Sequence, residues 1–335
     1  MRNFDPCHYV TTSNHRLYYG SSNDNGVHCI DLRTGKELWV FFTNGAVRLP
    51  PSITNNKAYF GSDDGFAYCI DAIKGTLIWK VHGAPEQRLV PSDGKLISTH
   101  PIRTGVTLID DKAVFAASLV PWAESYLWCV DQNTGTIENG GYTMHSDNVT
   151  LQGAMLYGGD LLYLPQGRAA CLKYDAKTGQ AKGNIGHSGG VVCLLTEDNQ
   201  FVSGPKNQKA KEDQMLLTDK QGKKLASFNN TNRVVVDGHL AFMHTNGKMS
   251  ALDQSVDEKS PERWKWQIEQ PAPTDLILAG DLLIIGLHHE VRVLNKLTGQ
   301  QLWAAKVDGE VHGLAVSNGQ LMISTNKGHI YAFAE

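Results

Sequence analysis

Three histidines offer the side chains for metal chemistry, because they recur at the same place in a repeating sequence. His100, His145 and His187 each precede an apolar segment in three consecutive repeats. Three imidazoles that leave one coordination position open suit zinc, manganese or iron. Such a metal would polarise the carboxylate of an acidic sugar while a His or Tyr removes a proton. The alternative is that these are ordinary loop histidines in a chain that contains 13.

Charged residues hold equivalent positions before the other apolar segments. Arg48, Arg103 and Arg233 are suited to bind a carboxylate or a sulfate. Alternatively, these arginines line a hydrated channel and pair with Asp147, Asp275 and Glu310. The predicted ligand-binding residues are Arg48, His100, Arg103, His145, Asp147, His187, Arg233, Asp275, Glu310 and His312. We assign no catalytic residue from the sequence.

The elements that carry these residues come from a phrase that the chain repeats. CIDLRTGKELW begins at Cys29 and CIDAIKGTLIW begins at Cys69. The Asp or Asn that ends the first strand of the phrase recurs at positions 31, 71, 131, 175, 219, 253 and 295. An Asp here can accept hydrogen bonds from turn amides, and the Gly that follows permits a left-handed backbone. The phrase therefore predicts a strand, a tight turn and a second strand.

Each repeat predicts four short antiparallel strands over about 40–45 residues, which is the length of a propeller blade. A four-stranded sheet cannot bury both faces alone, so the blades must stack on one another. Counting the repeats predicts an all-β, eight-bladed β-propeller that forms a single domain over residues 1–335. The eighth unit lacks its outer strand, which an N-terminal strand would supply. Residues 1–7 are short for this role, so we expect a further segment upstream.

Tryptophans and cysteines in the phrase predict core packing. We expect Trp39, Trp79, Trp264 and Trp303 to wedge between adjacent blades. Cys29, Cys69 and Cys129 hold the same place in equivalent strands, which favours small buried residues over disulfides. No CxxC occurs in the sequence, so zinc-ribbon and thioredoxin-like sites are excluded.

Composition excludes several classes of partner. The chain has 335 residues and a net charge of −3, without the basic stripe that nucleic acid or an anionic membrane requires. No run of eighteen apolar residues predicts a transmembrane segment. The first residues, MRNFDPCHYV, do not form a signal peptide, although a leader upstream would still allow export.

Two loops and one turn interrupt the regular repeat. An insertion over residues 82–102 would cap the funnel or contact a partner. Trp122 lies in a second excursion, where it would either stack on a sugar or a partner's side chain, or be buried against the insertion. GSDDG, from Gly61 to Gly65, precedes a strand instead of a helix and predicts a hairpin turn, not a phosphate loop.

The repeats resemble the PQQ-like (pyrroloquinoline-quinone-type) propeller repeat family. The resemblance covers nearly the whole chain through D-x-x-TG-x-x-LW, and GSDDGFAYCIDAIKGTLIWK and LLYLPQGRAACLKYDAKTG are similar to bacterial members of planctomycete type. It implies a WD40-like propeller and a periplasmic or secreted protein. The wider family includes the BamB scaffold and quinoprotein alcohol dehydrogenases, so fold alone does not select a function.

The quinoprotein members imply a testable site. They place a vicinal Cys-Cys disulfide against the quinone and hold calcium with Glu, Asn and Asp. No Cys-Cys occurs here, and no calcium ligands can be matched to positions in this chain.

Three functions follow as alternatives. The favoured one is a non-catalytic propeller that binds a small ligand, a saccharide or a protein through its polar axial funnel, as a monomer or part of a longer chain. The second is a quinoprotein dehydrogenase, or a degenerate relative, that uses PQQ and calcium. The third is a metal-dependent, lyase-like enzyme that acts on an acidic sugar. For the cofactor, the sequence favours the absence of any cofactor. PQQ with calcium and a histidine-bound transition metal are the alternatives.

Overall fold

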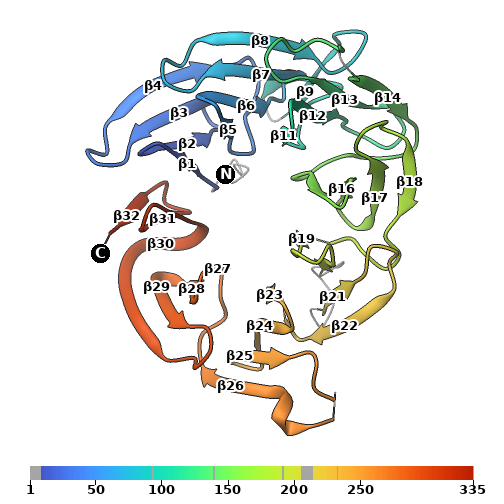
Figure 1. The fold of residues 1–335 in the computed structure, drawn as a ribbon. Coiled ribbons are helices and arrows are strands. Elements are labelled where there is room, and N and C mark those ends of the chain that lie inside the picture. The colour runs from blue at the N-terminus through green and yellow to red at the C-terminus, as the bar shows by residue number, and fades with distance from the viewer. Residues whose placement is uncertain are drawn as a thin grey trace. The chain divides into compact units, whose positions relative to one another are not determined.

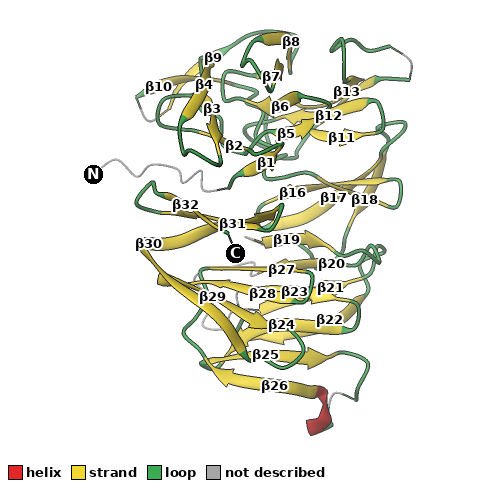
Figure 2. Cartoon of the chain, turned by 60° about the vertical axis from the view of Figure 1, so that its left-hand side comes forward, coloured by secondary structure: helices red, strands yellow, loops and turns green. Residues whose placement is uncertain are grey.

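The structure is a computed structural model that describes residues 9–92, 94–138, 140–190, 192–204, 214–231, 233–257 and 259–334. Within these ranges the regular elements are β-strands, drawn in yellow in Figure 2, and one 3-10 helix of three residues. No described helix is long and apolar enough to span a lipid bilayer.

The chain divides into two compact units. Unit 1 comprises Met1–Gln166 and Cys171–Asn184, and unit 2 comprises Gly167–Ala170 and Ile185–Glu335. The expectation of one domain over the whole chain stays a prediction.

Unit 1 consists of four-stranded antiparallel sheets whose strands lie in sequence order (Figure 1). The first sheet contains β1 (Thr11–Ser13), β2 (Arg16–Gly20), β3 (Gly26–Asp31) and β4 (Glu37–Phe42). The second contains β5 (Ser52–Thr54), β6 (Lys57–Gly61), β7 (Phe66–Asp71) and β8 (Leu77–His82), and a hairpin of β9 (Leu89–Ser92) and β10 (Lys95–Ser98) follows it. The third contains β11 (Thr107–Ile109), β12 (Lys112–Ala117), β13 (Ser125–Asp131) and β14 (Tyr142–Ser146). The fourth contains β15 (Leu156–Gly158), β16 (Leu161–Gln166), β17 (Ala169–Asp175) and β18 (Ala181–Asn184), with the first residues of β17 assigned to unit 2.

Unit 2 continues the same topology and ends in a larger sheet. Its first sheet contains β19 (Val192–Leu195), β20 (Phe201–Gly204), β21 (Gln214–Thr218) and β22 (Lys224–Asn229). The next contains β23 (Val234–Asp237), β24 (Leu240–Thr245), β25 (Lys248–Asp253) and β26 (Trp264–Glu269), and the helix η1 (Pro261–Arg263) precedes β26. The last, six-stranded sheet contains β27 (Asp275–Ala279), β28 (Leu282–Gly286), β29 (His288–Asn295), β30 (Gln301–Ser317), β31 (Gln320–Thr325) and β32 (Ile330–Phe333).

These sheets are four-stranded antiparallel blades of a β-propeller, as the repeats predicted, but the predicted number of blades is wrong. The described residues form six four-stranded sheets and one six-stranded sheet, seven and not eight, besides the β9–β10 hairpin. The physical reason is that β30 runs for 17 residues without a turn. It pairs with β29 as far as Glu310 and with β31 from Val311 onward, so two expected sheets merge into one. The strand expected to close the last blade involves residues 1–7, which lie outside the described residues.

The hydrophobic core lies between neighbouring sheets, which explains why the sequence must repeat. Tyr59 and Trp79 of the second sheet pack against Ala113 and Phe115 of the third. In unit 2, Phe242 and Trp266 pack against Leu283 and Ile285 of the following sheet in the same way. Burying one such large apolar side chain contributes about 1.5–3 kcal/mol. A sheet without a neighbour would leave the face that carries these side chains exposed to water.

Each predicted turn forms at its Asp or Asn, and in four of the turns an aromatic ring of the preceding sheet covers the glycine. Oδ1 of Asp71 accepts hydrogen bonds from the backbone N–H groups of Ile73 and Lys74, both at 2.8 Å. Gly75 has a φ of +69°, and a Cβ there would lie 2.6 Å from Cδ2 of Trp39. We call this arrangement the aromatic–glycine contact. It recurs as Trp79 over Gly135, Tyr142 over Gly179 and Trp266 over Gly299.

The tryptophan predictions are therefore confirmed in part. Trp79 is buried, and its Nε1 donates to the carbonyl oxygen of Gln132 in the next sheet at 3.0 Å. The prediction for Trp264 is wrong, because its side chain is 38% exposed and Trp266 holds the wedge position two residues later. Adjacent strand residues face opposite sides, so a one-residue bulge between Ala251 and Leu252 decides which tryptophan points inward. Trp303 is 37% exposed and contacts the ring of Phe333.

The predicted small buried cysteines are confirmed. Cys29, Cys69 and Cys129 are free and buried at equivalent strand positions. Burial raises the pKa of each thiol to about 11, so the reactive thiolate is disfavoured.

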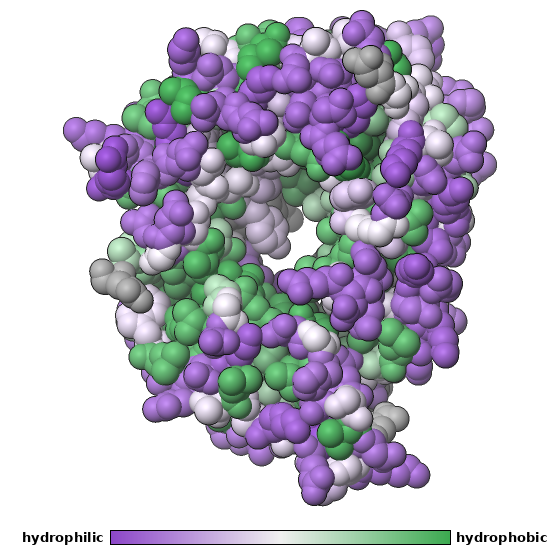
Figure 3. Space-filling model, in the orientation of Figure 1, coloured by the Kyte–Doolittle hydropathy of each residue, from purple (hydrophilic) through white to green (hydrophobic). Residues whose placement is uncertain are grey.

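Hydrophilic side chains dominate the rim of the face shown in Figure 3, and apolar side chains are more frequent away from the rim. Trp122 is 83% exposed, so the alternative that it is buried is wrong. The insertion over residues 82–102 contains the β9–β10 hairpin, whose Lys95 Nζ donates to the carbonyl oxygens of Ser22 and Asn23 in the first sheet.

Candidate anion-binding site

Two of the predicted arginines meet at one buried carboxylate in unit 1. Nε and Nη2 of Arg48 donate to Oδ2 of Asp63 at 2.9 and 2.7 Å. Nε of Arg103 donates to Oδ1 at 2.8 Å and its Nη2 donates to Oδ2 at 2.9 Å. The side chain of Asp63 is 1% exposed, against 24% for Arg48 and 17% for Arg103. The three side chains form a fixed cluster that we call the arginine pair site.

Local sequence explains why Asp63 is held so firmly. It lies in the β6–β7 turn, the GSDDG segment, where the predicted hairpin turn is confirmed by a bond from Gly65 N–H to the Ser62 carbonyl. The backbone N–H of Asp63 donates to the carbonyl oxygen of Ala46 at 2.9 Å. A Cβ on Gly45 would lie 2.3 Å from the backbone nitrogen of Asp64, so only glycine lets the two segments approach this closely.

The two arginines come from equivalent loops. Arg48 lies between β4 and β5, and Arg103 lies between β10 and β11. Each loop leads into the innermost strand of the next sheet. The β9–β10 hairpin also contacts the turn, because the N–H of Ser98 donates to the carbonyl oxygen of Asp63 at 2.8 Å. The insertion thus supports the arginine pair site.

The electrostatics of the cluster keep the carboxylate of Asp63 charged. Burial alone would raise the pKa of Asp63, but the hydrogen bonds from Arg103 and Arg48 outweigh it and hold the pKa below its ordinary value. Asp63 is therefore ionised at neutral pH, and two guanidinium groups share one negative charge. Within the described residues, Nη1 of Arg103 makes no hydrogen bond. A guanidinium group held in place with an N–H group left over, as in Arg103, is suited to bind an anion.

Sequence reasoning missed Asp63, which pairs with both Arg48 and Arg103. The alternative that the predicted arginines pair with Asp147, Asp275 and Glu310 stays a prediction. Asp63 is separated by 15 residues from Arg48 and by 40 residues from Arg103. It lies in a segment whose sequence predicts only a turn. One signal was present, because GSDDG carries two adjacent carboxylates where a hairpin turn needs at most one.

His100 and His145 lie on either side of a different group, Tyr126. The ring of His100 contacts the ring of Tyr126, with 5.5 Å between centroids, and burial lowers the pKa of His100. His145 pairs with Tyr126 in the β13–β14 register and is exposed. Asp147, just beyond β14, is also exposed. Among the described residues, no side-chain hydrogen bond or ion pair joins His100, His145 or Asp147 to the arginine pair site.

The remaining predicted residues form a second cluster, in unit 2. Burial raises the pKa of Asp275, while the nearby charges of Arg233 and His312 act in the opposite direction. Glu310 lies 2.7 Å from Nε2 of His288 and 3.3 Å from Nε2 of His312. Arg233 and His312 are therefore near enough to Asp275 to affect its pKa. That these residues bind a ligand in an axial funnel stays a prediction.

The three-histidine metal site stays a prediction. His187 belongs to unit 2, whereas His100 and His145 belong to unit 1. In the part of the chain that the structure describes, no group of three or more His, Cys, Asp or Glu side chains is arranged to hold a metal ion.

Comparison with known proteins identifies the family. A model of the family described as outer membrane protein assembly factor BamB matches residues 23–293. The chain belongs to this BamB family. The structural neighbours of this BamB-family chain have low sequence identity and show the fold alone. The computationally designed Ika8 protein has a TM-score of 0.71 and 14% identity, covering 99% of this chain and 97% of its own.

Enzymes also carry this fold. Quinohemoprotein alcohol dehydrogenase from Comamonas testosteroni has a TM-score of 0.63 and 14% identity, covering 94% of this chain and 69% of its own. By sequence, tetrathionate hydrolase from Acidithiobacillus ferrooxidans is 26% identical over 113 residues, which is 34% of this BamB-family chain. The match spans only 19% of the hydrolase.

Proposed function

We propose that this chain is a non-catalytic binding propeller and that the arginine pair site holds an anionic group of its ligand. The observation that carries the proposal is the sharing of one buried carboxylate, Asp63, by two guanidinium groups. The ligand class is a small molecule that carries a carboxylate or a sulfur oxyanion. The family membership is consistent with a binding role, because the family description names an assembly factor.

Burial and shared geometry distinguish this cluster from an ordinary surface ion pair. Arg33 and Asp31 form a one-to-one pair at 3.5 Å with the arginine side chain 73% exposed, so water screens it. At the arginine pair site, the side chains are mostly buried and the carboxylate serves both arginines. Asp63 orients the guanidinium groups before a ligand arrives, which lowers the entropy cost of binding.

Three probes represent the proposed ligand class. Sulfate and glutarate present the two oxyanion types, and tetrathionate combines two sulfonate ends. The name of the Acidithiobacillus relative motivates tetrathionate as a probe and assigns no hydrolysis to this chain. Binding is measured by titration calorimetry in a low-salt buffer free of phosphate, because salt screens exposed charges.

We expect at least one probe to bind the unmodified protein and Arg103→Lys to weaken this binding about tenfold. Lysine keeps the charge but lacks the planar fork, so the substitution tests geometry and not charge alone. Arg33→Lys is the matched control, since Arg33 is exposed and lies outside the site. Equal affinity of the Arg103→Lys protein, or no binding of any probe, contradicts the proposal.

We also propose a location outside the cytoplasm, in line with a family description that names the outer membrane. Fractionation of cells that express the native gene product tests this. Recovery of the protein with cytoplasmic markers would reject it.

A further inference from the structure

Unit 2 contains a separate cavity at the seam between two neighbouring sheets. Its volume is about 430 Å³, within the range of roughly 300–1,000 Å³ found for small-molecule sites. It lies on the side of the sheets where the Asp turns are found. The lining residues come from the β19–β20 turn, β21, β22, the β23–β24 turn and the segment between β25 and β26. They are Asp198, Gln200, Leu217, Leu225, Ala226, Gly238, His239, Gln254, Ser255 and Arg263.

Arg263 is the lining residue with an unsatisfied hydrogen-bond donor. The helix η1 fixes its backbone, because the N–H of Arg263 donates to the carbonyl oxygen of Ser260 at 3.2 Å. Its Nε is buried and has no hydrogen-bond partner among the described residues. A buried N–H donor without a partner costs free energy, so a cationic one in a cavity indicates a missing anionic acceptor.

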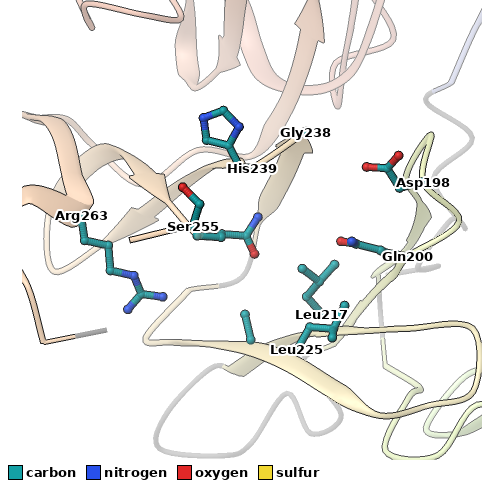
Figure 4. A pocket seen from close by; sticks show the side chains of 10 residues that line it. Asp198, Gln200, Leu217, Leu225, Gly238, His239, Ser255 and Arg263 are labelled. Atoms are coloured by element: carbon teal, nitrogen blue, oxygen red, sulfur yellow. The ribbon is translucent and has the colours of Figure 1, made fainter. Parts of the chain in front are cut away.

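The opposite side of the cavity carries the opposite charge. Figure 4 shows Asp198 across the pocket from Arg263, with Leu217 and Leu225 along its lower side. Asp198 is exposed and makes no ion pair within the described residues. The side chain of Leu225 is 46% exposed, which leaves apolar surface for a ligand to cover.

The other charged groups nearby are already engaged. His239 lies 3.8 Å from Asp253, and Lys265 lies 3.0 Å from the same carboxylate. Ser255 Oγ also donates to Asp253, at 2.6 Å. Arg263 and Asp198 therefore remain as one cation and one anion, separated by an aliphatic surface.

We propose that this cavity binds a small aliphatic amino carboxylate. Its carboxylate pairs with Arg263, its ammonium pairs with Asp198, and its methylene chain covers Leu217 and Leu225. Arginine binds a carboxylate through a planar fork, and each buried methylene adds about 0.8 kcal/mol of hydrophobic stabilisation. The site is distinct from the arginine pair site, which lies in unit 1.

The test uses ω-amino acids of increasing length, from 4-aminobutanoate to 8-aminooctanoate, with hexanoate and hexylamine as half-ligands. Binding to the full chain is followed by calorimetry at up to about 10 mM, where even a millimolar site is occupied. We expect one length to bind best and each half-ligand to bind at least about tenfold more weakly.

Two variants test which residue binds the carboxylate of the ligand and which binds its ammonium group. Arg263→Gln removes the preference for the amino acid over hexylamine, and Asp198→Asn removes the preference over hexanoate. Arg33→Gln is the control for a loss of positive charge elsewhere, and unfolding midpoints verify that all variants fold. Half-ligands that bind as well as the amino acids, unchanged binding to Arg263→Gln, or no binding in the series would overturn the proposal. Arg103→Lys leaves this binding unchanged, so the two sites are tested independently.

Discussion

At the scale of single residues, Asp63 serves both stability and recognition. Its carboxylate compensates two guanidinium groups that are mostly buried, and its hydrogen bonds also fix their orientation. Removing one member of a buried ion cluster leaves uncompensated charge behind, which costs more than the net value of the cluster itself.

We predict that Asp63→Asn lowers the free energy of unfolding by about 3 kcal/mol at pH 7. Asparagine has nearly the same shape but removes the carboxylate charge that both Arg48 and Arg103 contact. Urea unfolding measures the change. Asp160→Asn is the control, because Asp160 is 73% exposed and lies 3.8 Å from Lys177, so its loss should change stability by less than about 0.5 kcal/mol.

We also predict that the stability difference between the Asp63→Asn variant and the unmodified protein depends on pH. The pKa of Asp63 is depressed in the folded state, so its contribution is fully present above the unfolded pKa of about 4 and is lost as pH falls through the folded value. The stability difference between Asp63→Asn and the unmodified protein should therefore shrink in acid. A difference that grows from pH 5 to pH 3 would count against this account.

The sequence indicated half of this site. Arg48 and Arg103 stood out because they occupy equivalent positions before innermost strands. Asp63 did not, because its role depends on a contact between the β6–β7 turn and the glycine at position 45. A contact between two turns has no periodic signature, so residue types alone cannot reveal it. For the same reason, the unpartnered Arg263 could not be found before the structure was known.

At the scale of elements, the aromatic–glycine contact joins neighbouring sheets. The ring fills the space over the glycine, and in three of the four contacts, those of Trp79, Tyr142 and Trp266, the indole or phenol group also donates to a carbonyl of the same turn. Trp266 Nε1, for example, donates to the Lys296 carbonyl at 2.8 Å. The contact combines apolar burial with a hydrogen bond and therefore fixes the distance between sheets.

We predict that Gly75→Ala destabilises the protein by about 1–3 kcal/mol more than Gly35→Ala does. Both glycines have positive φ, at +69° and +66°, so both substitutions carry the same backbone strain. Only at Gly75 would the new Cβ meet a ring, that of Trp39, since nothing lies within 4 Å of a Cβ at Gly35. Chemical denaturation compares the two, and equal effects would show that the ring contact adds nothing.

The repeats specified strands, turns and stacked sheets correctly, because strand alternation and turn chemistry are local. They did not specify the sheet count. Gly309, with a φ of +98°, lets β30 change direction without a turn, and a Cβ there would lie 2.7 Å from Oδ1 of Asn326. A strand that bends at a glycine and a strand that ends there have the same sequence pattern. The choice between Trp264 and Trp266 was missed for a similar reason, since a bulge shifts the register by one residue.

At the scale of the whole molecule, carboxylates make the chain sensitive to acid. Hydrogen bonds from Arg292 and Lys306 lower the pKa of Glu290 to about 2, and the Ser255 hydroxyl and Lys265 lower that of Asp253 to about 2. Asp24, Asp31, Asp131 and Asp175 also have lowered pKa values. Among these described acids, Asp275 is shifted in the opposite direction by burial.

We therefore predict that the free energy of unfolding falls as pH is lowered from about 5 to about 2.5. The lowered groups contribute above their unfolded pKa, near 4, and lose that contribution as pH falls through their folded values. Urea midpoints across this range measure the trend. A midpoint that stays constant or rises in acid would show that these hydrogen bonds are absent in solution.

The direction of the aromatic–glycine contact also bears on how such a chain can arise. Each ring reaches forward along the chain, from Trp39 to Gly75 and from Trp79 to Gly135, so the second sheet carries both a ring for its successor and a glycine for its predecessor. A gene duplication that copies one whole repeat would copy both the ring and the glycine of the aromatic–glycine contact. Ancestral genes could thus gain or lose repeats by unequal crossing-over without first evolving a new interface.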